Sequence, residues 1–171
     1  MLDNDNDQFE GQREKLAESI GEFVKYWGFK SVHGKTWLYI YTSEQPMTAT
    51  ELVQKLGVTK SLVSMVLSDL VDYKVIKRVD IGSAKSPGYV SEEDLEKAIF
   101  SVLREREFKL LKGIQRDISE FQDLVKGSKQ LENRSKQLEK MTDYAVDSLD
   151  RLLNSKSIST SKLKLLLKLS R

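Results

Sequence analysis

Apolar residues recur at helical spacing along most of the chain. Over residues 8–27 they are separated by three, four or seven positions, which places them on one face of a helix. Asp7 is predicted to cap this helix and Gly28 to end it. A second apolar helix is expected to begin at Gly34 and to end near Ser43, before Pro46.

The next segment, "MTATELVQKLG", predicts a short helix with a capping box. Thr48 is followed three residues later by Glu51, which is the spacing of reciprocal capping, and Gly57 is expected to end the helix. Thr59 then caps a further helix over residues 60–73. Two short helices joined by a tight turn at Gly57 are typical of a helix-turn-helix.

The pattern changes to short β-prone runs after this second helix. Residues 75–80 and 88–91 predict two strands, and the Gly/Ser/Pro-rich residues 82–87 predict the tip between them. A hairpin directly after a recognition helix is a wing.

From Ser91 onward the chain is predicted to be helical, with Ser91 as its cap. Apolar residues again recur at three, four and seven positions, with a break at 127–128 and a final basic-apolar helix in "KLKLLLKLSR". A stripe this long needs a surface to pack against, and a partner subunit or the N-terminal helix would supply it. The expected domains are 1–30 (N-terminal helix), 31–91 (winged helix-turn-helix) and 92–171 (coiled-coil-like dimerisation region).

Composition favours a helix-rich, soluble protein. Of 171 residues, 39% are hydrophobic and 32% charged, with nine Gly and two Pro. Cysteine is absent, which excludes disulfides and thiolate metal sites and fits a reducing cytoplasm. The acidic start "MLDNDNDQFEGQREK" does not predict a signal peptide, and no apolar run predicts a membrane span. The net charge of +2 permits nucleic-acid binding without requiring it.

The predicted recognition helix has an unusual polar face. Val63, Val66, Leu67 and Leu70 form its inward side. An α-helix fits the major groove, where small hydroxyls, a cation and a thioether can contact base edges. The side chains predicted to face the bases are Lys60, Ser61, Ser64, Met65 and Ser68.

Phosphate contacts are predicted at the helix starts and in the wing. Free N–H groups and hydroxyls at a helix start, and cations in a wing, are suited to phosphate oxygens. The predicted residues are Thr48, Thr59, Lys77, Arg78 and Lys85. The alternative interpretation is a solvated serine-rich face and a plain surface hairpin with ordinary lysines.

From about Phe23 to Val79 the chain resembles the GbsR-type branch of the MarR family of transcriptional regulators. The shared features are "GKTWLYIY", then "PMTATELVQKLG", then "GVTKSLVSMVL". The resemblance implies a homodimeric winged helix-turn-helix repressor or activator that dimerises through its N- and C-terminal helices. It also implies an effector site between the DNA-binding lobe and the dimer helices. The wing segment "IGSAKSPGYV" departs from the family pattern because it has no arginine.

The aromatic residues of the first 41 positions include a candidate effector pocket of Tyr26, Trp27, Trp37 and Tyr41. Aromatic cages bind quaternary ammonium groups through cation–π attraction. The alternative is that Phe23, Trp27 and Trp37, which sit at helical spacings, fill the hydrophobic core. A single histidine, His33, makes no metal site.

The fold class expected is mainly α, a winged helix-turn-helix with long C-terminal dimerisation helices. The function expected is a sequence-specific double-stranded DNA-binding regulator, most simply a repressor, acting as a homodimer on a pseudo-palindromic operator with half-sites about 10 bp apart. No catalytic motif, metal site or cofactor is predicted. The alternative function is a protein-interaction scaffold with a coiled-coil extension and no DNA binding.

Overall fold

Residues 2–82 and 86–154 are described by a computed structural model of the chain, and they form two units. The first unit ends at Val102 and the second begins at Leu103. Lys85 and the predicted basic helix in "KLKLLLKLSR" lie outside the described residues. None of the helices in the described ranges combines the length and the apolarity that a membrane crossing requires.

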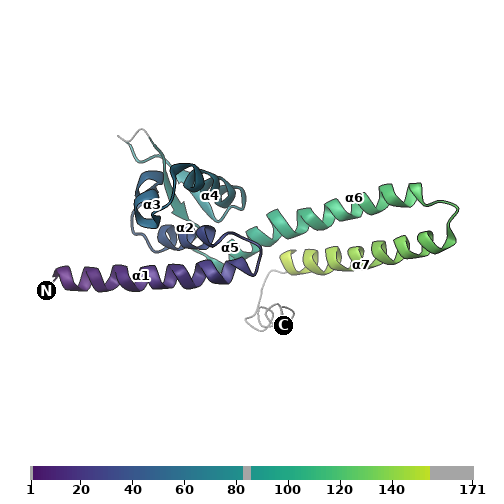
Figure 1. The fold of residues 1–171 in the computed structure, drawn as a ribbon, viewed down its shortest axis with the longest axis horizontal. Coiled ribbons are helices and arrows are strands. Elements are labelled where there is room, and N and C mark those ends of the chain that lie inside the picture. The colour runs from purple at the N-terminus through teal and green to yellow at the C-terminus, as the bar shows by residue number, and fades with distance from the viewer. Residues whose placement is uncertain (1, 83–85, 155–171) are drawn as a thin grey trace. The chain divides into compact units, whose positions relative to one another are not determined.

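The first unit confirms the winged helix-turn-helix architecture (Figure 1). Four helices, α1 to α4, precede the hairpin β2–β3, which is the predicted wing. A strand that the sequence pattern did not predict, β1, pairs antiparallel with β3 through Met47 and Tyr89, so the sheet order is β1-β3-β2. The elements are α1 (Leu2–Lys25), α2 (Ser31–Tyr41), β1 (Met47–Thr48), α3 (Ala49–Leu56), α4 (Lys60–Asp72), β2 (Ile76–Val79), β3 (Gly88–Ser91) and α5 (Leu95–Val102).

The first two helices begin earlier than predicted. Helix α1 starts at Leu2, so Asp7 lies inside it rather than at its cap. Helix α2 starts at Ser31, so Gly34 is an interior residue. A Cβ on Gly34 would lie 2.9 Å from the carbonyl oxygen of Ile20 and from a methyl of Val24. The absence of a side chain at Gly34 therefore allows α1 and α2 to cross closely, and this residue does not start a helix.

The caps of the helix-turn-helix are confirmed. The Thr48 hydroxyl accepts from the backbone N–H of Glu51 at 3.3 Å, and the Glu51 carboxylate accepts from the backbone N–H of Thr48 at 2.7 Å. Gly57 ends α3 with φ at 62°, a left-handed conformation that favours glycine. The Thr59 hydroxyl accepts from the N–H of Leu62 and caps α4.

The predicted cap at Ser91 is wrong. Ser91 is the last residue of β3, where it pairs with Ile76, and α5 begins only at Leu95. Asp94 caps that helix by accepting from the backbone N–H of Lys97 at 3.1 Å. Ser91 fails as a cap because its backbone is held in the sheet.

The core of the first unit lies under the helix-turn-helix. Side chains from α2, α3, α4, the sheet and α5 form one buried cluster. This packing fixes the position and orientation of α4 within the unit. Leu52, Val63 and Val66 have no exposed surface, and Leu67 is 1% exposed.

The second unit is a helical hairpin. It contains a π-helical segment, η1 (Leu103–Phe108), followed by α6 (Lys109–Leu124) and α7 (Lys129–Asn154). The predicted break at 127–128 is confirmed, because Gly127 adopts a φ of 96° between the two helices. Across the hairpin the Gln122 amide donates to the Glu139 carboxylate at 3.0 Å.

Candidate nucleic-acid interface

Helix α4 separates its side chains into a buried face and an exposed face. Val63, Val66, Leu67 and Leu70 pack into the core, as the sequence pattern predicted. The five side chains predicted to face bases are all exposed, which places them together on the solvent side. They are Lys60, Ser61, Ser64, Met65 and Ser68.

The hydroxyls of the two cap residues are partly occupied. The Thr48 hydroxyl donates to the Glu51 carboxylate at 2.7 Å, so its proton is committed to the capping box. These hydrogen bonds hold the pKa of the Glu51 carboxyl below its usual value, and a charged carboxylate repels a phosphate. Thr59 lies 3.2 Å from Ser61, oxygen to oxygen, at the exposed start of α4. The geometry thus favours Thr59 over Thr48 as a phosphate contact.

The two described wing cations do not share a face. Lys77 and Arg78 are both exposed and adjacent in β2, so their side chains point to opposite sides of the sheet. Arg78 lies opposite Tyr89, which is buried, and Lys77 lies opposite Val90. Only one of the two can face a given DNA backbone directly.

Residues 29–33 dock along α4, and the sequence pattern did not predict this. Lys30 Nζ lies 3.8 Å from Met65 Sδ, and His33 Nε2 lies 2.9 Å from the Asp69 carboxylate. The Phe29 ring meets the Tyr73 ring edge-on at 5.5 Å. The three partners on α4 are four residues apart, so they form one stripe down the helix. His33, 7% exposed, is therefore a structural link between α2 and α4.

Arg13 fastens α1 to the end of α2. Its guanidinium donates to the Thr42 hydroxyl at 2.8 Å and to the backbone carbonyl of Tyr39, and it lies 4.9 Å from the centre of the Tyr39 ring. It also pairs with Glu10, which accepts from Lys55 of α3. The hydrogen bond from Lys55 is the main cause that holds the pKa of the Glu10 carboxyl below its usual value. These contacts fix α1 on the helices that carry the recognition surface.

The four residues of the candidate effector pocket occupy different environments. Trp37 and Tyr41 stack within α2 at 4.9 Å between ring centres, and Trp37 packs against the core. Trp27 lies beside Phe23 at 6.1 Å, and Tyr26 is 91% exposed. A cage must enclose its ligand, and Tyr26 does not enclose anything within this unit. Trp37 therefore follows the core interpretation more closely than the cage, and Tyr41 stacks on it.

Comparison with known proteins gives two curated relatives from Bacillus subtilis (strain 168). The HTH-type transcriptional repressor OpcR is 28% identical over 96 residues, which cover 56% of this chain and 52% of that protein. The putative HTH-type transcriptional regulator YvaV is 28% identical over 85 residues, which cover 50% of this chain and 48% of that protein. The chain thus spans about half the length of the relatives it matches. No protein-family model matches it.

A crystal structure of a transcriptional regulator superposes on the chain with a TM-score of 0.69. The superposition covers 83% of this chain and 95% of that one at 13% sequence identity, so the likeness is one of fold. The chain is therefore similar in sequence, over about half its length, to HTH-type transcriptional regulators, and it shares the fold of a solved regulator.

Proposed function

We propose that this protein is a sequence-specific, double-stranded DNA-binding regulator of transcription. The observation that carries the proposal is the exposed face of α4, where five side chains suited to base edges lie opposite a fully buried face. A solvated helix face normally carries long charged side chains, whereas this one carries serines, one methionine and one lysine. The names of the two relatives support the same function.

In this proposal α4 enters the major groove. Serine hydroxyls donate to or accept from base edges, Met65 contacts thymine methyl groups, and Lys60 reaches a guanine or a phosphate. The exposed N–H groups at the start of α4, beside Thr59, bind a phosphate oxygen. Of the wing cations, Lys77 or Arg78, whichever of the two faces the duplex, and Lys85 add contacts to the DNA backbone.

We further propose that the protein acts as a homodimer and a repressor of the GbsR-type branch of the MarR family. Two copies of α4 related by a two-fold axis would read a pseudo-palindrome with half-sites about one helical turn apart. Apolar side chains exposed in each unit support self-association, because a second copy would cover them. In α1 they are Phe9, Leu16 and Phe23, and in the second unit they include Leu110, Ile114, Phe121, Leu138 and Met141.

The test is DNA binding across a salt series with a matched pair of variants. Duplexes are first selected from a random pool, and the observed association constant is then measured as salt rises. For a DNA-binding protein, the logarithm of the association constant falls linearly with the logarithm of the salt concentration, and the number of phosphate contacts sets the slope. The double variant Ser64→Glu/Met65→Glu should abolish binding because two carboxylates then face the groove.

The control variant Ser119→Glu/Gln130→Glu adds the same charge at exposed positions of α6 and α7. It should bind as the wild type does. If the Ser64→Glu/Met65→Glu variant still binds while remaining folded, the exposed face of α4 does not face DNA. If the wild type selects no duplex at low salt, the protein is a scaffold rather than a DNA-binding regulator.

A further inference from the structure

We infer that Lys30, which lies before α2 and outside the helix-turn-helix, contacts the DNA backbone beside the recognition helix. The inference rests on the proposed function. Its starting point is the docking of residues 29–33 along one stripe of α4, through Met65, Asp69 and Tyr73.

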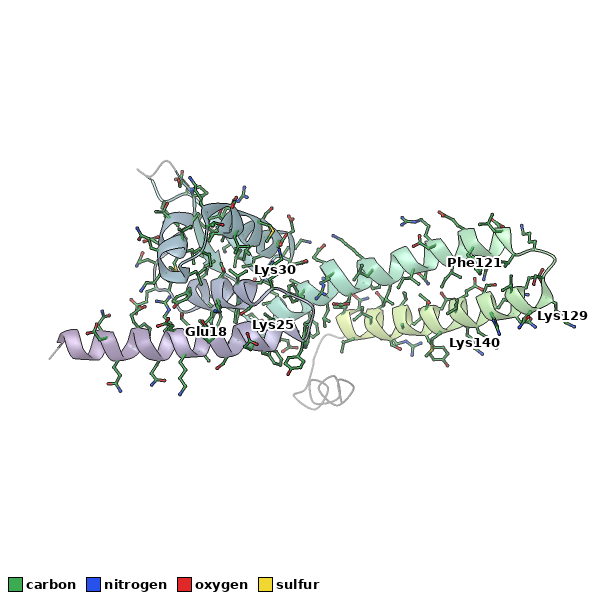
Figure 2. All side chains as sticks on the ribbon, in the orientation of Figure 1. Glu18, Lys25, Lys30, Phe121, Lys129 and Lys140 are labelled. Carbon is green, nitrogen blue, oxygen red and sulfur yellow. The ribbon has the colours of Figure 1, made fainter. Side chains whose placement is uncertain are left out.

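The docking fixes where the Lys30 ammonium lies. His33 Nε2 meets the Asp69 carboxylate, and His33 Nδ1 lies 3.2 Å from the backbone carbonyl of Lys30 itself. The backbone of Lys30 is thus tied through one buried side chain to the third turn of α4. The ammonium of Lys30, which is labelled in Figure 2, lies beside Met65, one of the proposed base-facing residues.

This position is at the edge of the groove when α4 is inside it. The major groove of B-DNA is about 12 Å wide, and an α-helix with its side chains is about 10–12 Å across. The helix therefore fills the groove, and a group that flanks it lies against a sugar–phosphate strand. A cation carried on the flank of α4 at Met65 is consequently closer to phosphates than to bases.

The charge of the Lys30 ammonium is also available for contact with a phosphate. Within residues 2–82 and 86–154 its ammonium makes no ion pair with a carboxylate; its hydrogen-bond partner is the Met65 thioether, a weak acceptor. Four other lysines of the first unit are paired with carboxylates: Lys25 with Glu22, Lys35 with Glu18, Lys55 with Glu10 and Lys97 with Glu92. Lys30 therefore moves to a phosphate without breaking a salt bridge.

The experiment compares the salt dependence of DNA binding for Lys30→Gln and Lys25→Gln, with a duplex selected by the wild-type protein as the probe. Each phosphate contact contributes about 0.9 to the slope of log association constant against log salt concentration. Lys30→Gln should lower that slope by about 0.9 and weaken binding to specific and mixed-sequence duplexes alike. Lys25→Gln removes the same charge five residues away and should leave the slope unchanged.

Lys30→Arg keeps the cation and should restore the wild-type slope, which a purely structural role of the lysine stem would not require. An unchanged slope for Lys30→Gln, or an equal decrease for Lys25→Gln, overturns the assignment while leaving the proposed function standing. Failure of the wild type to bind any duplex at low salt overturns both. Circular dichroism of each variant establishes that the fold is retained.

Discussion

At the residue scale, Thr48 and Glu51 hold the start of α3 through two reciprocal hydrogen bonds. Replacement of Thr48 by alanine removes the acceptor of the Glu51 N–H and should lower the free energy of unfolding by about 1 kcal/mol. Urea denaturation followed by circular dichroism measures the change. Thr50→Ala, at the exposed neighbouring position, is the control and should stay within about 0.5 kcal/mol of the wild type. Equal losses in the two variants would contradict the capping role.

The Glu51 carboxyl also makes this cap dependent on pH. Hydrogen bonds from Thr48 lower its folded-state pKa below the ordinary value of 4.5. The charged form therefore stabilises the fold above that value, and the stabilisation is lost as the pH falls through the folded-state pKa. Glu51→Gln should be less stable than the wild type at neutral pH, and the gap should shrink under acid conditions. Urea midpoints measured across this range check it, and a gap independent of pH would contradict it.

The sequence could predict those residue-scale contacts that are local. Thr48, Gly57 and Thr59 are recognisable because a cap acts on a backbone group at most four residues away. The bonds of Arg13 to Tyr39 and of His33 to Asp69 join residues 26 and 36 positions apart. Nothing in the local pattern distinguishes these two side chains from solvated ones, because their partners meet only after the helices have packed.

At the element scale, the crossing of α1 and α2 depends on the absence of a side chain at Gly34. A Cβ there would lie 2.9 Å from the backbone of Ile20, so the helices would have to separate. Gly34→Ala should therefore lower the unfolding free energy by about 1–3 kcal/mol despite the better helix propensity of alanine. Gly11, in α1, has open space around it. Gly11→Ala should stabilise the protein by about 0.4–1 kcal/mol, and thermal unfolding of both variants would reveal the opposite signs. A Gly34→Ala variant as stable as the wild type would mean that the helices do not cross this closely.

The spacing of apolar residues predicted whether an element is a helix or a strand more reliably than it predicted the residue at which the element begins. The helix-turn-helix and the wing were predictable because short apolar runs alternate with glycine and capping residues. The start of α1 was not, since Asp7 is able to cap a helix but does not prevent the chain from being helical before it. Strand β1 has only two residues, and it forms because Met47 pairs with Tyr89 of the hairpin.

At the scale of the whole molecule, the apolar ridge of α1 is not covered by the rest of the first unit. Phe9, Leu16 and Phe23 are seven residues apart and are 52%, 48% and 51% exposed, while the adjacent residue Ala17, on another face of the helix, is buried against the core. A seven-residue apolar repeat is the spacing at which two helices pack along their length. The ridge is therefore the natural site for the N-terminal part of the proposed dimer interface.

Leu16 lies at the middle of this ridge, so Leu16→Glu should shift the monomer–dimer equilibrium toward monomer by burying a charge in any such interface. Operator affinity should fall by about 10²-fold or more, because a monomer engages one half-site and loses the gain from linking two. Sedimentation velocity and gel shifts on the same samples measure the two effects together. Gln8→Glu adds the same charge on α1 outside the ridge and should change neither quantity. If Leu16→Glu dimerises as the wild type does, the α1 ridge is not part of the interface, and the exposed apolar residues of α6 and α7 are left to form it.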